Sequence, residues 1–236
     1  MTTLIECIPN ISEGRRPEVV EAVRKAAVGA GPGVLLLDWT SDADHNRSVL
    51  TFLGDGPGLL RGMEAMVDEA IRHVDLTKHE GAHPRLGAVD VIPFVPIRGA
   101  TTADCVALAK ELSARLAAKH GLPIYLYEDA ATSEARRNLA TIRKGEFEGL
   151  AEKMKSPEWK PDFGPEAPHP TAGATVVGAR SPLIAYNINL GTADLSIADR
   201  IAKSIRHLSG GFRFVKAMGV RLEARGGGVT FGRRQL

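Results

Sequence analysis

The most informative stretch of this sequence is His79-Glu80-Gly81-Ala82-His83-Pro84-Arg85-Leu86-Gly87-Ala88-Val89-Asp90. It contains the pattern His-Glu-x-x-His, which zinc peptidases place on a helix so that both histidines share one face. A helix is not expected here, because a glycine lies inside the pattern and Pro84 disfavours helical backbone at the residue before it. The apolar run over residues 89–95 is typical of a buried strand. We therefore expect His83 on a loop that leads into a strand, where catalytic side chains are often found.

The elements around this loop are expected in the order β-α-β-β-α-β. Apolar runs indicate the strands and apolar residues at helical spacing indicate the helices, at residues 4–8, 16–29, 34–37, 49–53, 58–73 and 89–95. A polar turn at residues 38–44 is expected after the second strand. This order predicts an α+β fold with a ferredoxin-like arrangement, in which an antiparallel sheet carries helices on one face.

The rest of the chain is expected to add further elements around a polar, irregular region. A helix capped by Thr101 and ended by Gly121 comes first. A strand and two short helical segments then follow at residues 124–127, 133–143 and 146–155. Two strands, a helix and a last strand are expected at residues 175–177, 184–190, 196–207 and 215–222.

The composition is that of an ordinary globular protein, because 44% of the 236 residues are hydrophobic and 25% are charged. The 30 Lys and Arg residues nearly balance the 28 Asp and Glu residues, so nothing points to nucleic acid as a partner. Cys7 and Cys105 lack the C-x-x-C spacing of a metal or redox site and indicate a reducing compartment. Neither a signal-peptide pattern nor a run of the ~20 apolar residues needed for a membrane span is present. We expect a cytoplasmic protein without a membrane or nucleic-acid partner.

His83 has three interpretations when its residue type and neighbours are considered alone. It could be a packed or surface histidine, a general acid/base, or a metal ligand. Pro84 disfavours the metal ligand, and no second cluster rich in histidine or cysteine supplies the further ligands that zinc needs.

The segment Asp44-His45-Asn46-Arg47 is a second candidate for chemistry. A carboxylate orients a histidine base, and an arginine binds a carboxylate through two parallel hydrogen bonds. The same residues are also typical of a capped turn with a solvated arginine, and Arg85 and Arg98 share this ambiguity. Two motif matches are rejected: residues 162–164 lack the other kinase motifs, and residues 226–228 lack the Lys-Ser/Thr of a phosphate loop.

Several segments taken together resemble the formiminotransferase domain family. The resemblance is carried by residues 6–14 (ECIPNISEG), 42–49 (DADHNRSV), 79–99, 123–127 (PIYLY), 143–148 (RKGEFE) and 159–165 (WKPDFGP). It covers residues 4 to about 222. The resemblance implies two ferredoxin-like subdomains with tetrahydrofolate held between them and no metal. It also implies transfer of the formimino group of N-formimino-L-glutamate to tetrahydrofolate, a step of histidine degradation.

The resemblance assigns roles to individual residues. The catalytic histidine of the family corresponds to His83, and we expect Asp44 to assist it, with Asp42 as an open alternative. Substrate-binding residues are expected at Asn10, Asn46, Arg47, Arg85 and Arg98. The folate-binding stretch of the family corresponds to Gly164, Pro165, Glu166, Ala167, Pro168, His169, Pro170, Thr171, Ala172 and Gly173.

The chemistry suits these residue types. A neutral His83 would accept a proton from the attacking folate amine and return it to the departing glutamate amine, and an unperturbed pKa of about 6.5 fits both roles. Both substrates carry carboxylates, which gives the arginines a binding role.

We expect residues 1–180 to form the N-terminal subdomain and residues 181–236 to form part of the second, in about β-α-β. The sequence beyond residue 225 departs from the family pattern, so we expect a shortened second subdomain with an exposed sheet edge, for which a homodimer is one remedy. Two alternative functions stay open: a folate-binding remnant without activity, and a 5-formyltetrahydrofolate cyclo-ligase that uses ATP. A zinc hydrolase ranks last.

Overall fold

The computed structural model describes residues 3–184, 187–221 and 229–232. The chain divides into two compact units, Met1–Pro182 and Leu183–Leu236, which have separate cores. Part of the strand predicted at residues 184–190, and the glycines 226–228, lie outside the described residues. None of the described helices is long and apolar enough to span a lipid bilayer.

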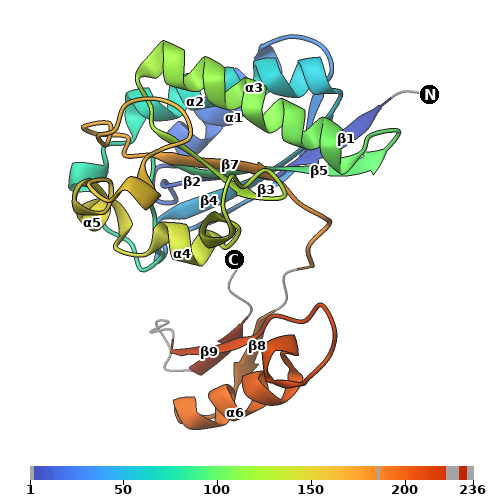
Figure 1. Ribbon diagram of the computed structural model, residues 1–236, viewed down its shortest axis with the longest axis vertical. Helices are drawn as coiled ribbons and strands as arrows, with labels where there is room; N and C mark the ends of the chain where they lie inside the picture. Colours follow the sequence, from blue (N-terminus) through green and yellow to red (C-terminus); the bar gives the residue numbers. More distant parts are fainter. Residues whose placement is uncertain (1–2, 185–186, 222–228, 233–236) are drawn as a thin grey trace. The chain divides into compact units, whose positions relative to one another are not determined.

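The first unit is built on a βαββαβ core. In chain order its elements are β1 (Leu4–Cys7), α1 (Pro17–Gly29), β3 (Val34–Asp42), β4 (Arg47–Gly54), α2 (Gly56–His73) and β5 (Val89–Arg98). The strands lie in the order β3-β4-β1-β5, and each neighbouring pair is antiparallel (Figure 1). A two-residue strand, β2 (Asn10–Ile11), continues the line of β1 between β4 and β5. This is the ferredoxin-like arrangement, so the predicted fold class is confirmed.

Beyond β5 the sheet continues with two parallel strands. Helix α3 (Thr102–His120) returns the chain so that β6 (Ile124–Glu128) runs parallel to β7 (Thr175–Ala179), and β7 runs parallel to β5. The antiparallel sheet predicted for residues 4–95 is confirmed, and the parallel strands extend it with a pairing that the sequence did not predict. A long crossover is what parallel pairing requires, but the apolar pattern of a strand does not reveal the direction of its neighbour.

Helices cover both faces of the complete sheet, although the helices within residues 4–95, α1 and α2, share one face as predicted. The first three helices lie on one face of the sheet (Figure 1). They enclose the larger core, in which Phe52 and Phe94 are fully buried. On the other face lie α4 (Leu139–Arg143) and α5 (Glu146–Lys153) (Figure 1). Their apolar side chains pack with Tyr125 and its neighbours in the second core cluster. Each such fully buried side chain contributes about 1.5–3 kcal/mol to stability. The second layer therefore fixes the region that the sequence marked as irregular.

Polar side chains define where the longer helices begin and end. Asp55 caps α2 by accepting a hydrogen bond from the amide of Gly58 at 2.7 Å. Thr101 and Asp104 form a reciprocal capping box at the start of α3, with hydrogen bonds of 3.2 and 2.8 Å. Gly121 ends α3 in the left-handed conformation, with φ at 60°. The predicted limits of this helix are confirmed.

Strand β3 is longer than predicted. Its pairing with β4 continues to Asp42 opposite Arg47, so residues 38–42, predicted as a polar turn, belong to the strand. The connection between the strands is only residues 43–46, and Asn46 takes the left-handed conformation there, with φ at 47°. The hairpin thereby fixes Asp42 and Arg47 opposite each other at the end of the sheet where β5 begins.

The second unit contains a three-stranded antiparallel sheet and one helix. Its elements are β8 (Asn187–Leu190), α6 (Leu195–Ile205), β9 (Met218–Arg221) and β10 (Val229–Gly232). The strand order is β8-β10-β9. The sequence predicted β-α-β here and missed β10. The described residues of both units also include four 3-10 turns, η1 (Leu76–Lys78), η2 (Glu134–Arg136), η3 (Pro157–Trp159) and η4 (His207–Ser209).

Candidate active site

Polar side chains gather at one end of the sheet in the first unit, where β4 and β5 begin and β3 ends. Arg47 opens β4, Asp42 closes β3 and Asp90 is the second residue of β5. Asn10 lies on β2 between β4 and β5. The loop of residues 79–88, called the His83 loop below, leads into β5 at the same end. The topology thus brings together segments that are far apart in the sequence.

The His83 loop is not helical, as predicted. The turn η1 ends before His79, whose backbone is extended with φ at −83° and ψ at 127°. Gly81 packs directly on the turn between β3 and β4, because a Cβ atom there would lie 2.4 Å from the carbonyl oxygen of His45. The amide of Ala82 donates to the carbonyl of Asp44 at 3.1 Å. The glycine inside the zinc-like pattern therefore serves close packing of two loops.

His79 uses both ring nitrogens inside the protein. Its Nδ1 accepts a hydrogen bond from Nε of Arg85 at 3.1 Å, and its Nε2 lies 3.0 Å from the carbonyl oxygen of Asn46. Since Nδ1 accepts, the proton of the neutral ring lies on Nε2 and is donated to that carbonyl. Burial lowers the pKa of His79, which also favours the neutral ring. No group of three or more His, Cys, Asp or Glu residues suited to a metal occurs in the described ranges.

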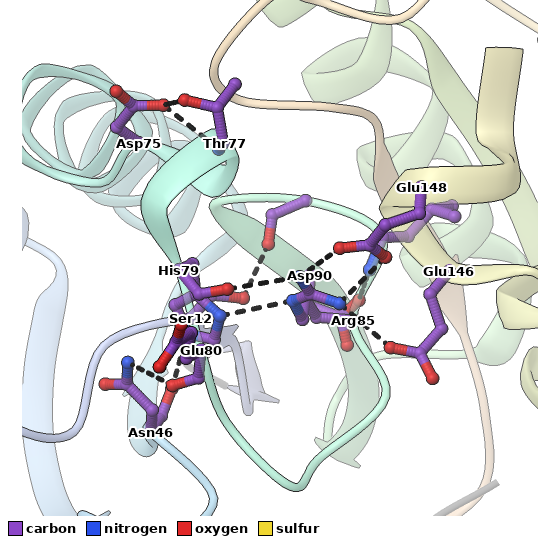
Figure 2. Close-up of polar contacts among 12 residues, drawn as sticks. Ser12, Asn46, Asp75, Thr77, His79, Glu80, Arg85, Asp90, Glu146 and Glu148 are labelled. Atoms are coloured by element: carbon purple, nitrogen blue, oxygen red, sulfur yellow. Dashed lines mark hydrogen bonds and ion pairs between the residues drawn. The ribbon is translucent and has the colours of Figure 1, made fainter.

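Arg85 uses all five of its N–H donors on protein acceptors (Figure 2). Besides its bond to the His79 ring, it donates to the carbonyl of His79, to Glu146 at 2.9 Å and to Glu148 at 3.0 and 2.5 Å. These contacts connect the His83 loop to α5. In this conformation every donor of Arg85 has a protein acceptor. Its predicted role in substrate binding stays a prediction.

His83 is half-buried, and its ring lies edge-on to the ring of His45 with 6.0 Å between the centroids. Burial, together with the charges of Arg47 and Arg143 and with His45, lowers the pKa of His83 to about 2. The imidazole is therefore neutral near pH 7 and has a lone pair with which to accept a proton.

Asp42, rather than Asp44, makes the contact to a histidine. Its Oδ2 lies 2.8 Å from Nδ1 of His45, and its Oδ1 accepts the amides of Asp44 and His45, both at 2.9 Å. Although burial raises it, these hydrogen bonds lower the pKa of Asp42 overall. Asp44 is exposed and contributes backbone groups to the turn. The order from carboxylate to ring to ring is thus Asp42, His45 and His83, and the assisting role of Asp44 stays a prediction.

The two predicted asparagines hold backbone segments around the site. Asn46 accepts from the amide of Gly14 at 3.0 Å and donates to the carbonyl of Glu80 at 2.9 Å, so it joins the turn to two other loops. Asn10 donates to the carbonyl of Ile8 at 3.0 Å and accepts a hydrogen bond from Arg47. Burial and the nearby charge of Arg143 lower the pKa of Arg47 to about 10, at which it is still charged near pH 7. The charge of Arg47 also acts on His83, and its role as a binding residue stays a prediction.

Sequence reasoning missed a buried ion pair, Asp90–Arg143. Asp90 is 2% exposed and accepts from the amide of Leu86 at 2.7 Å, while its other oxygen accepts from Arg143 of α4. The pair anchors the end of the His83 loop to the helix layer. One signal was present in the sequence: a lone carboxylate inside an apolar strand pattern is expected to have a buried partner.

The predicted folate-binding stretch, Gly164–Gly173, forms an ordered connection before β7. Residues 165–167 are exposed, and His169 closes a tight turn by accepting two following amides at 3.3 and 3.0 Å. The carbonyl of Ala172 accepts from the amide of Ala88 at 3.0 Å, which attaches the stretch to the His83 loop. Arg98, by contrast, is exposed at the other end of β5, about 30 Å from Val89 by strand length, and is not brought to this cluster.

Comparison with known proteins identifies the family. The chain matches the N-terminal subdomain of the formiminotransferase domain over residues 4–180. It is 49% identical over 225 residues to a glutamate formimidoyltransferase of Streptococcus pyogenes. The aligned region covers 95% of this chain and 75% of the relative. The chain belongs to the formiminotransferase family.

Other relatives of the formiminotransferase family extend this result. A glutamate formimidoyltransferase of Thermoplasma acidophilum is 44% identical, with 92% of this chain and 71% of the relative covered. The formimidoyltransferase-cyclodeaminase of Sus scrofa is 46% identical, with 87% of this chain but 38% of the relative covered. The formiminotransferase match contains the whole cluster around His83, including the ion pair of Asp90 and Arg143.

Proposed function

We propose that this protein is a glutamate formimidoyltransferase, which transfers the formimino group of N-formimino-L-glutamate to tetrahydrofolate in histidine degradation. The observation that carries the proposal is the half-buried ring of His83, which burial and the charges of Arg47 and Arg143 keep neutral, within the family match. A base and cations suited to carboxylates are what a reaction between two carboxylate-bearing substrates requires.

The proposed mechanism uses His83 twice. A ring amine of tetrahydrofolate attacks the amidine carbon of the formimino group, a new C–N bond forms, and His83 accepts the proton of that amine. The tetrahedral intermediate then breaks its bond to the glutamate nitrogen, which takes the proton from His83 and leaves as the amine of L-glutamate. Asp42 supports this exchange through His45.

We further propose that the stretch Gly164–Gly173 borders the folate, supported by its attachment to the His83 loop through Ala88. Residues 1–180 would act as the N-terminal subdomain and residues 181–236 as part of the second. Tetrahydrofolate is then a co-substrate, and the proposal includes no metal. A cytoplasmic location is supported by the unpaired, buried thiols of Cys7 and Cys105. A homodimer stays a prediction.

The test is to mix the purified chain with N-formimino-L-glutamate and tetrahydrofolate and to measure formation of formiminotetrahydrofolate. His83→Ala should lower turnover by about 100-fold or more with folate binding retained. His73→Ala is the matched control, because His73 is exposed at the end of α2 and should leave turnover unchanged. Folate binding without turnover in the wild type would contradict the proposal and favour the inactive alternative. Conversion of 5-formyltetrahydrofolate that depends on ATP would favour the cyclo-ligase.

A further inference from the structure

A second histidine, His45, lies beside His83. The two rings meet edge-on, at an angle of 61° and with 6.0 Å between their centroids. His45 belongs to the turn between β3 and β4, and its side chain is 27% exposed. A ligand that contacts the half-buried ring of His83 would therefore have the ring of His45 within reach.

The two ring nitrogens of His45 have different surroundings. Nδ1 lies 2.8 Å from Oδ2 of Asp42, so this nitrogen carries a proton and donates it to the carboxylate. Nε2 makes no hydrogen bond to another residue that the structure describes, whereas both ring nitrogens of His79 make one. A carboxylate on one ring nitrogen and an accessible second nitrogen are the arrangement found in histidines that transfer protons.

Asp42 and the turn hold His45 in this position. Oδ1 of Asp42 accepts the amide of His45 at 2.9 Å, in addition to the contact of Oδ2 with the ring. Burial raises the pKa of Asp42, but hydrogen bonds from the amide and the ring of His45 lower it overall, so the carboxylate is ionised near pH 7. An ionised carboxylate beside an imidazole favours the protonated ring. Gly81 packs directly on the carbonyl oxygen of His45, which keeps the turn against the His83 loop.

Contacts between a histidine and a carboxylate also occur elsewhere, so the contact alone does not mark a site. His73 pairs with Glu69 at 2.9 Å within α2, and His120 pairs with Asp68 at 2.7 Å between α3 and α2. Among the described residues, His45 is the one whose ring meets the ring of another histidine. The combination of a carboxylate, an accessible nitrogen and a neighbouring base is what distinguishes His45.

The proposed reaction needs a proton at a third nitrogen. Attack by the folate amine moves the electron pair of the C=N bond onto the imino nitrogen of the formimino group, and this nitrogen must carry a proton to hold the pair. His83 serves the attacking amine and then the glutamate nitrogen. In the tetrahedral intermediate all three nitrogens are bonded to one carbon, so the groups that serve them must lie close together. The 6.0 Å between the rings of His45 and His83 meets this requirement.

We propose that His45, held by Asp42, is a second catalytic residue, which supplies the proton of the imino nitrogen while His83 serves the other two nitrogens. The inference rests on the proposed function and deepens it. Before attack, one proton is shared between Nε2 of His45 and the imino nitrogen. As the new C–N bond forms, the imino nitrogen takes this proton and becomes an amino group, and His45 is left neutral. When the bond to glutamate breaks, the C=N bond forms again and the proton returns to Nε2. Asp42 is then a positioning residue that acts through His45.

The first experiment replaces His45 with glutamine, which can donate a hydrogen bond to Asp42 but cannot transfer a proton. His45→Gln should lower kcat by about 100-fold, with folate binding retained and with KM for N-formimino-L-glutamate changed by less than about threefold. His73→Gln is the matched control, because it also removes a histidine paired with a carboxylate but lies at the end of α2, and it should keep the wild-type kcat. A wild-type kcat in His45→Gln, with or without a raised KM, would overturn the inference.

A second readout separates proton transfer from a structural role of His45 in the turn. His45→Ala leaves space for free imidazole beside Asp42, so added imidazole should raise kcat of this variant by about tenfold or more, up to a saturating concentration. The same imidazole should leave kcat of His45→Gln unchanged, because glutamine fills the space. A displaced turn is not repaired by a free base, so a loss of kcat in His45→Ala without rescue would overturn the inference.

A double variant tests whether Asp42 acts through His45. Asp42→Asn/His45→Gln should be no slower than His45→Gln, since the effect of Asp42 requires the imidazole. A further loss of about tenfold would show that Asp42 acts independently and would overturn the pairing of the two residues. Turnover by the wild type that is equal in His45→Gln would overturn this inference alone, whereas a wild type without turnover would overturn the proposed function and the inference with it.

Discussion

Replacing Arg85 with methionine tests whether its hydrogen bonds hold the His83 loop in place. The Arg85 side chain is 9% exposed, but its partners Glu146 and Glu148 are 40% and 61% exposed, so each ion pair contributes at most about 1 kcal/mol. The hydrogen bond to Nδ1 of His79, at 3.1 Å, contributes about 0.5–1.5 kcal/mol. Because the variant loses these together, we expect the free energy of unfolding to fall by about 2 kcal/mol. The loop should also move relative to Asp90 and lower kcat.

The assay is urea unfolding followed by fluorescence of Trp39 and Trp159, combined with steady-state kinetics. Arg137→Met is the matched control, because Arg137 is exposed and pairs with Asp129 at 3.4 Å, so its loss should cost less than about 0.5 kcal/mol. A loss of stability below about 0.5 kcal/mol in Arg85→Met would refute the holding role. A raised KM with normal kcat and stability would refute it too, and would support the prediction that Arg85 binds a substrate carboxylate.

Three further predictions concern the same region. Gly81→Ala should lower turnover by about tenfold or more, because its Cβ would meet the carbonyl of His45 at 2.4 Å and push the loop away; wild-type kinetics would contradict the packing argument. The pKa of Glu13 lies below its ordinary value of 4.5, because hydrogen bonds from Arg16 and Arg15 outweigh the effect of burial. Ionised Glu13 therefore stabilises the fold above pH 4.5, and this stabilisation is lost as the pH falls through the lowered pKa. Glu13→Gln should therefore show a flatter loss of unfolding free energy between about pH 6 and pH 3, and parallel curves would count against this. Asp42→Asn should lower kcat by about tenfold with little change in folate affinity, and a kcat equal to that of the wild type would exclude the support through His45.

The core of the fold followed from periodic patterns because those patterns are local. The capping residues of α3 and the apolar spacing of α2 lie within each helix, and both helices occur close to the predicted positions. The direction of β7 was not predictable in the same way, since it depends on pairing with β5 more than 80 residues earlier. The prediction of the length of β3 was wrong for a similar reason. Its polar residues 38–42 read as a turn, but pairing with β4 holds them in the strand.

The same contrast between local and long-range interactions applies to the residues of the site. The loop position of His83 was predictable because Pro84 acts on its neighbour through local backbone sterics. The partners of Arg85 were not, because Glu146 and Glu148 come from α5, 61 and 63 residues away. The sequence alone does not show whether the guanidinium group of an arginine is hydrogen-bonded to protein carboxylates or is available to bind a ligand.

That difference separates the arginines that were predicted to bind substrate. The resemblance to the family favoured Arg47, Arg85 and Arg98 by residue type, and the structure separates them by what their donors already contact. Arg98 lies at the far end of β5 and the donors of Arg85 are all bound by protein acceptors, whereas Arg47 opens β4 at the end of the sheet where the His83 loop enters β5. The zinc-like pattern marked the loop that carries His83, but the charges that lower the pKa of His83 come from β4 and from a helix 60 residues further along the chain. Such long-range neighbours are set by the topology of the sheet, which no local pattern around His83 reveals.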